Sequence, residues 1–326
     1  MKIAIVILNW NGKALLEQFL PDIIRYSPTE YCDIYVADNA STDDSIAYIK
    51  QNFVSVKIIQ NKTNGGYAQG YNEALQHIQA TVYALVNSDI EVTRDWLAPI
   101  HQHFIEHPET GIVQPKIRDY KRKEYFEYAG AAGGFIDQLG YPYCRGRIFD
   151  HIEKDTGQYD DSIPIFWASG ACLFIRSEVF HKLGGFDTDY FAHQEEIDLC
   201  WRAFNMQYNT VYIGASTVYH VGGATLDKSH WKKTFLNFRN SLYNLVKNAP
   251  GNYLWLIFQR LILDGIAGVK FLLEGKPLHT FAILKAHFSF YAHFTKMQHK
   301  RKQIPAKRTD YYQVKSIVWN HFIKKD

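Results

Sequence analysis

The chain has 326 residues, of which 47% are hydrophobic and 21% charged, a composition typical of a globular protein with one large or two modest domains. Its four cysteines are far apart and include no Cys-x-x-Cys pair, which argues against a zinc site and against a disulfide framework, and indicates reduced thiols in the cytoplasm. The apolar run at 3–8 is short and has no small-residue cleavage site, so we interpret it as a buried strand rather than a signal peptide.

The net charge of +3 conceals an uneven distribution. Residues 1–226 carry 18 Lys and Arg against 28 Asp and Glu, a net of −10, whereas residues 227–326 carry 18 against 5, a net of +13. A basic tail on an acidic body indicates an anionic partner, either a membrane surface or nucleic acid.

Strand, turn and helix patterns alternate through the first ninety residues. Strands are predicted at 3–8, 33–37, 56–60 and 83–86, with helical patterns in between, including one at about 43–51. Repeated βαβ units predict an α/β fold with a doubly wound, mostly parallel sheet and right-handed crossovers.

Polar side chains follow each of these strands. Because parallel strands end at the same edge of a sheet, we expect the side chains to line one crevice in the position where such folds bind nucleotides. The residues concerned are Asn9, Asn11, Asp38, Asn64, Gly65, Asn87, Ser88, Asp89 and Glu91.

Two of these positions have a specific chemistry. Asp38 accepts hydrogen bonds and so suits a base or a ribose, although it also suits a helix-capping turn. Gly65 and Gly66 lead into a helix, where backbone N–H groups can approach an anion. The fingerprints of dinucleotide-binding and P-loop proteins are missing, which argues against a nicotinamide dehydrogenase and a P-loop ATPase.

Asp89 and Glu91 stand two residues apart after a buried strand. Two carboxylates in this arrangement, completed by diphosphate oxygens, suit a divalent cation such as Mg²⁺ or Mn²⁺. An acidic turn without a ligand is the alternative.

Past residue 92 the pattern is less regular. We expect a helix at 95–106, a strand at 112–115, an irregular binding loop or lid over 118–165, and a turn followed by a buried strand within 166–175. Glu195, Glu196 and Asp198 then open a helix, where the helix dipole favours acidic residues. The alternative is that Asp198 or Glu195 pairs with Arg202. His220 follows at a strand end beside paired glycines.

Taken together and in this order, these segments resemble family 2 glycosyltransferases of the GT-A fold, particularly bacterial rhamnosyltransferase-like members. The resemblance covers about residues 1–225. The matching segments are 6–11, 36–43, 61–72, 87–91 (Asn-Ser-Asp-Ile-Glu), 169–173, 184–187 (Gly-Gly-Phe-Asp), 195–202 (Glu-Glu-Ile-Asp-Leu-Cys-Trp-Arg) and 220–223 (His-Val-Gly-Gly).

The resemblance implies roles for individual residues. Asp38 matches the residue that holds the nucleotide base, and Asp89 with Glu91 matches the Asp-x-Asp metal motif, with Glu as its second acid. Glu196 matches the general base and Glu195 the acid before it, although the longer Glu196 side chain leaves open which of them is the base. His220 matches a histidine near the metal or diphosphate. The Gln-x-x-Arg-Trp signature of processive synthases is missing, which favours transfer of a single sugar.

These residue types suit sugar transfer. A divalent cation neutralises the departing diphosphate, and a carboxylate removes the proton of the attacking hydroxyl. One base without a covalent nucleophile predicts inversion at the anomeric carbon.

From residue 231 the pattern is helical. An Arg-Asn pair resembles a segment common in these enzymes, and we expect Arg239 to face the diphosphate or an anionic acceptor; a surface ion pair is the alternative. The stretch 253–273 is too interrupted to span a membrane, but with 278–294 and the basic run 296–308 it suits an anionic membrane surface. Ordinary packing on the core or in a homodimer is the alternative, and no nucleic-acid motif accompanies the charge.

We therefore predict a GT-A domain at 1–225, with a nucleotide-binding half (1–92) and an acceptor-side half (93–225), and a basic amphipathic helical region at 226–326. The predicted enzyme moves one sugar from a dTDP-, UDP- or GDP-sugar to a hydroxyl of a cell-surface glycan or lipid-linked acceptor, in the cytoplasm or at the inner face of the plasma membrane. A nucleotidyltransferase would need a basic Gly-rich loop, which 9–12 does not provide. A degenerate nucleotide-sugar-binding or membrane-scaffold protein is the non-enzymatic alternative.

Overall fold

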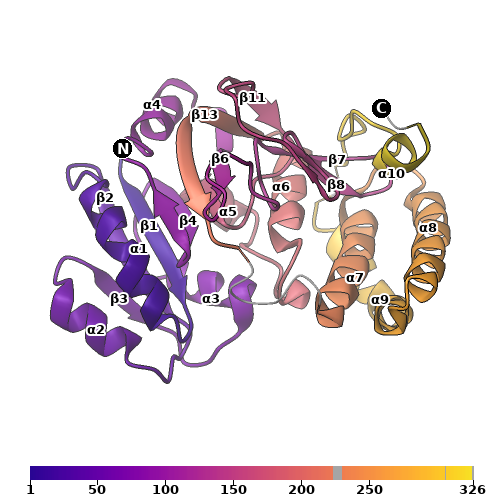
Figure 1. The fold of residues 1–326 in the computed structure, drawn as a ribbon, viewed down its shortest axis with the longest axis horizontal. Coiled ribbons are helices and arrows are strands. Elements are labelled where there is room, and N and C mark those ends of the chain that lie inside the picture. The colour runs from indigo at the N-terminus through magenta and orange to yellow at the C-terminus, as the bar shows by residue number, and fades with distance from the viewer. Residues whose placement is uncertain (223–229, 305, 325–326) are drawn as a thin grey trace.

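A computed structural model describes residues 1–222, 230–304 and 306–324. Gly223, the last glycine of the predicted 220–223 motif, and the predicted domain boundary at 225 lie outside these residues. The chain forms an α/β layer that carries three long helices at one end (Figure 1).

The first half of the chain forms the predicted βαβ units. Parallel strands β3, β2, β1 and β4 lie side by side in that order. Their bounds are β1 (Ile3–Asn9), β2 (Cys32–Asp38), β3 (Lys57–Gln60) and β4 (Val82–Asn87), and the helices between them are α1 (Lys13–Arg25), α2 (Ser45–Asn52) and α3 (Gly66–Leu75). The predicted alternation is confirmed.

The second half completes a mixed sheet. Strand β12 lies antiparallel between β4 and β6, and β6 pairs in parallel with the long β13, which also holds β5 and β11. The elements are β5 (Ile90–Val92), α4 (Ala98–Glu106), β6 (Thr110–Asp119), β11 (Ser162–Ile165), β12 (Cys172–Arg176), α5 (Ser177–Lys182), the short 3₁₀ helix η1 (Thr188–Tyr190), α6 (Glu195–Asn205) and β13 (Asn209–His220).

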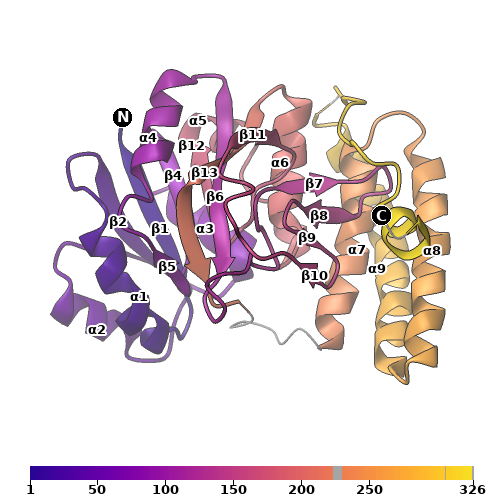
Figure 2. The same cartoon turned by 45° about the horizontal axis from the view of Figure 1, so that its top comes forward.

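The prediction of an irregular loop over 118–165 is wrong. This segment contains the end of β6, strand β11 and a small antiparallel sheet, which lies between the main sheet and the C-terminal helices (Figure 2). Its strands are β7 (Gly134–Ile136), β8 (Pro142–Cys144), β9 (Arg147–Ile148) and β10 (His151–Ile152). Strands of two or three residues are too short to show alternation of apolar and polar side chains, so the pattern did not predict them.

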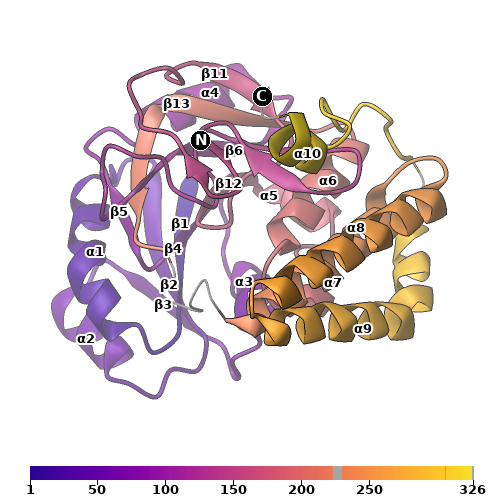
Figure 3. The ribbon, with the colours of Figure 1, turned by 45° about the vertical axis from the view of Figure 1, so that its right-hand side comes forward.

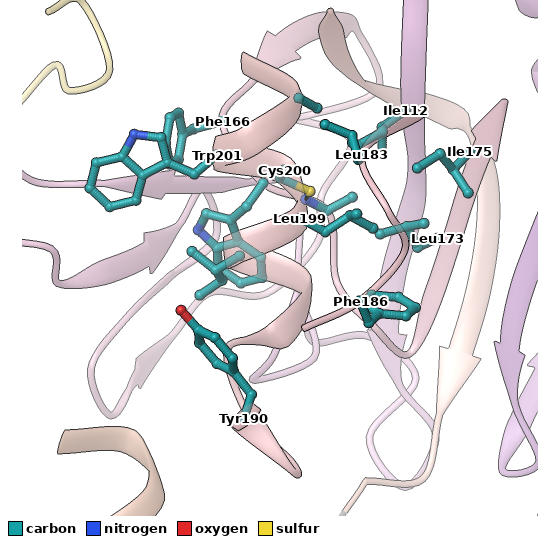
Figure 4. Packing of buried hydrophobic residues seen from close by; sticks show 14 of the residues in the cluster. Ile112, Phe166, Leu173, Ile175, Leu183, Phe186, Tyr190, Leu199, Cys200 and Trp201 are labelled. Atoms are coloured by element: carbon teal, nitrogen blue, oxygen red, sulfur yellow. Dashed lines mark hydrogen bonds between the residues drawn. The ribbon is translucent and has the colours of Figure 1, made fainter. Parts of the chain in front are cut away.

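Both faces of the main sheet are buried. Helices α1, α2 and α4 cover one face, and α3, α5 and α6 cover the other. Helix α6 is held from several directions, because Leu199, Cys200 and Trp201 pack among Phe166, Leu173 and other large side chains from neighbouring elements (Figure 4). This packing fixes where α6 begins, and with it the position of its first two carboxylates.

The predicted C-terminal helical extension is present. Helices α7 (Trp231–Asn248) and α9 (Pro277–Arg301) run side by side, and α8 (Tyr253–Leu273) crosses them on the outside (Figure 3). A short helix α10 (Ile317–Trp319) and a π-helical turn η2 (Asn320–Lys324) follow. Among the described residues, none of the helices has both the length and the apolar composition needed to cross a membrane.

Candidate active site

The ends of β1 and β2 are joined by one polar network. The buried Asn9 donates from Nδ2 to Asp38 Oδ1 (3.0 Å) and to the Ser45 hydroxyl (2.9 Å). Asp38 Oδ2 accepts from the Ser41 N–H (3.1 Å), and Asn11 Oδ1 accepts from the Thr42 N–H (2.7 Å). Asn9, Asn11 and Asp38 therefore lie together, as predicted, and they shape the loop before α2.

A chain of amides connects this network to the start of α3. Asn61 donates to Asn39 Oδ1 (2.8 Å), Asn39 donates to the Gly66 carbonyl (2.9 Å), and Asn64 Oδ1 accepts from the Gly66 N–H (3.0 Å). Gly65 directly precedes α3. Sequence reasoning missed Asn39 and Asn61, although both belong to the polar clusters that it identified.

Gly66 lies where the two halves of the site meet. Its φ is +78°, and a Cβ there would come within 2.9 Å of the carbonyl oxygen of Phe191, just before α6. Next to it, the Tyr67 hydroxyl donates to the Gly170 carbonyl (2.8 Å), and a Cβ on Gly170 would lie 3.8 Å from Glu196 Cβ. The start of α3 is therefore adjacent to the start of α6.

Asp89 and His220 are brought together from distant parts of the sequence. Asn87 ends β4 in register with Leu8, and Ser88 and Asp89 follow at the same edge of the sheet. Asp89 is 5% exposed, and its Oδ1 lies 3.2 Å from His220 Nε2. On the other side of the ring, His220 Nδ1 lies 3.4 Å from Glu127 Oε1. Glu127 was missed, since it falls in the stretch predicted to be irregular.

The charges of this cluster depend on one another. Burial opposes a charge on His220, but hydrogen bonds to the Asp89 and Glu127 carboxylates raise its pKa to about 10. Burial likewise opposes ionisation of Asp89, yet its hydrogen bond with His220 lowers its pKa. A positively charged imidazole therefore lies between the two carboxylates.

Glu91 lies in a different environment. It is opposite Tyr219 in the β5–β13 pairing, and its carboxylate forms an ion pair with Lys123. In the part of the chain that the structure describes, no three His, Cys, Asp or Glu side chains are arranged to hold a metal ion. The cluster still fits a cation bound together with a diphosphate, because Mg²⁺ in such sites takes only one or two protein carboxylates. Asp89 supplies that carboxylate, and His220 an adjacent nitrogen that becomes a ligand only once the imidazolium has released its proton.

The first two carboxylates of α6 are buried without a cation. Glu195 is 5% exposed, and one carboxylate oxygen of Glu195 and one of Glu196 are buried with no hydrogen-bond partner. Burial raises the pKa of Glu196 to about 7, and burial together with repulsion from Glu196 raises the pKa of Glu195 well above its usual range. Both shifts oppose ionisation, and of the two acids Glu196 is the one whose pKa lies near neutral pH.

Asp198, one turn further along, has the opposite environment. Its carboxylate accepts from Arg202 Nε (2.8 Å) and Lys247 Nζ (2.6 Å), and despite burial these two cations lower its pKa. The alternative in which Asp198 pairs with Arg202 is confirmed. Of the three acids that begin α6, Asp198 is therefore structural.

The segment before α6 has an unusual backbone that α7 holds in place. Phe191, His193 and Gln194 have φ values of 64°, 67° and 68°, which are unfavourable for residues other than glycine. Asn240 donates to the carbonyls of Ala192 (3.0 Å) and His193 (2.7 Å). Together these contacts set the direction in which Glu195 and Glu196 point.

Arg239 braces the same segment. Its guanidinium donates to the carbonyls of Asp189 (3.2 Å) and Tyr190 (3.1 Å). Contact with a diphosphate or an acceptor stays a prediction. Sequence reasoning assigned no role to Asn240, although it is the second residue of the Arg-Asn pair that contains Arg239.

With this geometry established, comparison with known proteins becomes informative. Residues 4–184, more than half of the chain, match the family described as Glycosyl transferase family 2. The chain belongs to glycosyltransferase family 2. It is 23% identical over 231 residues to N-acetylglucosaminyl-diphospho-decaprenol L-rhamnosyltransferase of Mycobacterium tuberculosis, covering 66% of this chain and 75% of that protein.

Two further comparisons extend past the matched residues. The low-salt glycan biosynthesis hexosyltransferase Agl10 of Haloferax volcanii is 22% identical over 287 residues, covering 84% of this chain and 86% of the relative. The crystal structure of GalNAc-T7 with UDP, GalNAc and Mn²⁺ superposes with a TM-score of 0.67 at 15% identity, covering all of this chain and 57% of that one. The family 2 assignment and the GT-A fold predicted from the motifs are thus confirmed.

Proposed function

We propose that this family 2 glycosyltransferase is metal-dependent and inverting, and that it moves one sugar from a dTDP-, UDP- or GDP-linked donor to a hydroxyl of a cell-surface glycan or lipid-linked acceptor. The observation that carries the proposal is the Glu196 carboxylate, which has no cation beside it and one buried oxygen without a hydrogen-bond partner, and whose pKa is raised to about 7. A base that accepts a proton at neutral pH needs a pKa in this range.

In this proposal Glu196 is the general base and Glu195 remains protonated beside it. Glu196 takes the proton of the acceptor hydroxyl as the hydroxyl oxygen attacks the anomeric carbon. The bond from that carbon to the diphosphate breaks on the opposite face of the sugar. Direct displacement with a single base inverts that carbon. The protonated Glu195 keeps a second negative charge away from the base and is available to donate a hydrogen bond to the acceptor.

The donor lies along the network at the strand ends. Asn9, Asn11 and Asp38 shape the loop that holds the nucleoside, and Asn64, Gly65, Asn87 and Ser88 face its phosphates or ribose. A Mg²⁺ or Mn²⁺ ion held by Asp89, with Glu91 and a deprotonated His220 as its other predicted ligands, would neutralise charge on the departing diphosphate. GalNAc-T7 was solved with UDP and Mn²⁺, which supports this class of ligand.

The rhamnosyltransferase relative is named for an acceptor whose sugar is carried on a polyprenyl diphosphate, which supports the lipid-linked acceptor class. We place the reaction in the cytoplasm, where thiols stay reduced; all four cysteines are free and buried. A scaffold that has lost catalysis would have no reason to keep two unpaired acids buried at the start of α6.

The test is a thermal-shift panel of UDP-, dTDP- and GDP-sugars with and without Mn²⁺, on wild type, Asp89→Asn and the exposed control Asp95→Asn. A donor present at about 100 times its Kd should stabilise the protein by about 2.7 kcal/mol. We expect stabilisation by one nucleotide class with Mn²⁺, lost in Asp89→Asn and kept in Asp95→Asn. If no donor stabilises the wild type, the scaffold alternative replaces this proposal.

A further inference from the structure

The outer face of α8 is apolar along its length. Leu254, Trp255, Phe258, Ile262, Ile266 and Val269 are each between 51% and 60% exposed. The other strongly exposed position between 254 and 269 is Gly265, so this surface carries no charge. A helix that faces water normally shows charged and polar residues on its outer side.

Arg260 and Asp264, the two charged residues in the middle of α8, point inward instead. Arg260 and Asp264 are buried and paired (2.8 Å), and Asp264 also accepts from the Tyr141 hydroxyl (3.3 Å). His287 of α9 approaches the other oxygen of Asp264 (3.3 Å). The arrangement of α8 is therefore the reverse of that of an ordinary surface helix: polar inside and apolar outside.

Helix α9 extends the apolar surface. Leu278, Phe281, Leu284, Phe288 and Tyr291 recur every three or four residues and are between 51% and 73% exposed. Meanwhile Ala282, Ile283 and Phe290, on the other side of α9, are buried. Ordinary packing thus accounts for only part of the apolar side chains of this region. Exposed apolar surfaces of this extent mark interaction sites.

The charges at the edge of this surface favour one kind of partner. Lys270 and Lys276 lie at the corner between α8 and α9, and Lys285 lies on α9, against a single exposed acid, Glu274. An anionic surface would meet a net positive edge and be attracted to it. A two-fold interface with a second copy of the chain would instead join two surfaces that both carry this net positive edge.

We propose that α8 and the exposed side of α9 dock this protein on an anionic lipid bilayer, lying in its interface with the aromatic side chains among the headgroups. Amphipathic helices bind membranes in this way without crossing them, and Trp and Tyr favour the interface. The inference goes beyond the proposed chemistry; only its link to a lipid-linked acceptor rests on that proposal.

The docking surface is connected to the candidate site through α7. Thr234 Oγ1 lies 2.7 Å from His279 Nδ1 at the start of α9, and Lys285 Nζ lies 5.4 Å from the Trp231 ring. Trp231 begins α7, and other residues of this helix hold the segment before α6. A bilayer bound at the α8–α9 corner would therefore lie beside the start of α7. In the sequence, this end of α7 comes after β13, the strand that ends with His220.

The test uses the full chain and vesicles of phosphatidylcholine alone or mixed in equal parts with phosphatidylglycerol. Co-sedimentation is measured for wild type, for Phe258→Ser/Ile262→Ser/Ile266→Ser, and for the control Val54→Ser/Ile105→Ser, which removes exposed apolar side chains from α4 and from the turn after α2, both in the α/β layer and away from α8 (Figure 1). We expect wild type and control to bind the anionic vesicles, and the triple variant to bind at least about tenfold more weakly.

A second variant, Lys270→Glu/Lys276→Glu, keeps the apolar face and should also bind at least about tenfold more weakly. Donor-induced thermal shifts in both variants show whether the fold and the nucleotide site are intact, so a failure of the proposed function is recognised separately. Equal binding by wild type and the triple variant overturns the proposal. A wild-type dimer that the triple variant converts to monomer, with no vesicle binding, overturns it in favour of self-association.

Discussion

Helices α6 and α8 both bury charged side chains, but in opposite ways. Helix α6 buries Glu195 and Glu196 without a cation, whereas α8 buries Arg260 and Asp264 against each other. Burial of an ion is costly unless it is paired and hydrogen-bonded. The charges of Arg260 and Asp264 balance each other, which indicates a structural role. Burial of Glu195 and Glu196 has a free-energy cost that no cation offsets. In our proposal, that difference separates the residues that take part in catalysis from those that hold the fold.

The largest effect should follow from removing the proposed base. Glu196→Gln keeps the shape of the side chain but cannot accept a proton, so we expect kcat to fall about 10³-fold with little change in KM for the donor. Steady-state kinetics at saturating acceptor measures this. In wild type kcat/KM should rise with pH through about 7, as Glu196 loses its proton, and this rise should vanish in the variant.

The matched control is Glu195→Gln, which should cost much less because a protonated Glu195 already resembles glutamine. A loss in Glu195→Gln equal to or larger than that in Glu196→Gln would exchange the two roles.

Disruption of the ion pair of α8 should lower stability rather than catalysis. Asp264→Leu leaves Arg260 buried without its partner and should lower the free energy of unfolding by about 3–5 kcal/mol. The double variant Arg260→Met/Asp264→Leu should recover most of that loss, because both charges are gone. Urea denaturation of the single and double variants checks this. If the double variant is as unstable as the single one, the pair contributes net stability and the comparison with α6 weakens.

Loss of the contacts that hold the segment before α6 should affect both catalysis and stability. Asn240→Ala removes hydrogen bonds to the Ala192 and His193 carbonyls and should cost about 1–3 kcal/mol of stability. We also expect kcat to fall while donor-induced thermal shifts persist, since the nucleotide network is held by its own hydrogen bonds. The control is Asn237→Ala, because Asn237 accepts a hydrogen bond from Gln194 through its backbone carbonyl, which alanine keeps. Equal losses in both variants would contradict the assigned role.

The parts of the site built from local sequence could be predicted. Asn9 and Asp38 follow adjacent parallel strands, so their meeting follows from strand alternation alone. Glu127 and Lys123 could not be found in this way. Their neighbours His220 and Glu91 depend on how β13 aligns with β6 and β5, a register set by contacts far apart in sequence.

The same limit applies to the C-terminal helices. The spacing of apolar residues predicts α8 and α9, but apolar residues occur around most of α8, so periodicity does not tell which side faces out. Arg260 and Asp264 interrupt the apolar run in the sequence, but the sequence alone does not show which side of the helix they face. Only the packing of Tyr141 and His287 against them shows that this polar side is the inner one.

The smallest expected effect is on the pH dependence of stability. The pKa of Glu196 is higher in the folded protein than in the unfolded chain, so the folded state binds its proton more tightly. This contribution is fully present at low pH and is lost as pH rises through about 7. Between pH 6 and 8 the free energy of unfolding of wild type should therefore fall by about 1 kcal/mol more than that of Glu196→Gln. Urea denaturation at several pH values measures the difference, with Glu178→Gln, an exposed glutamate in the first turn of α5, as control. If Glu196→Gln and wild type lose stability in parallel, Glu196 is ionised throughout this range, and the contrast between the unpaired acids of α6 and the paired charges of α8 disappears.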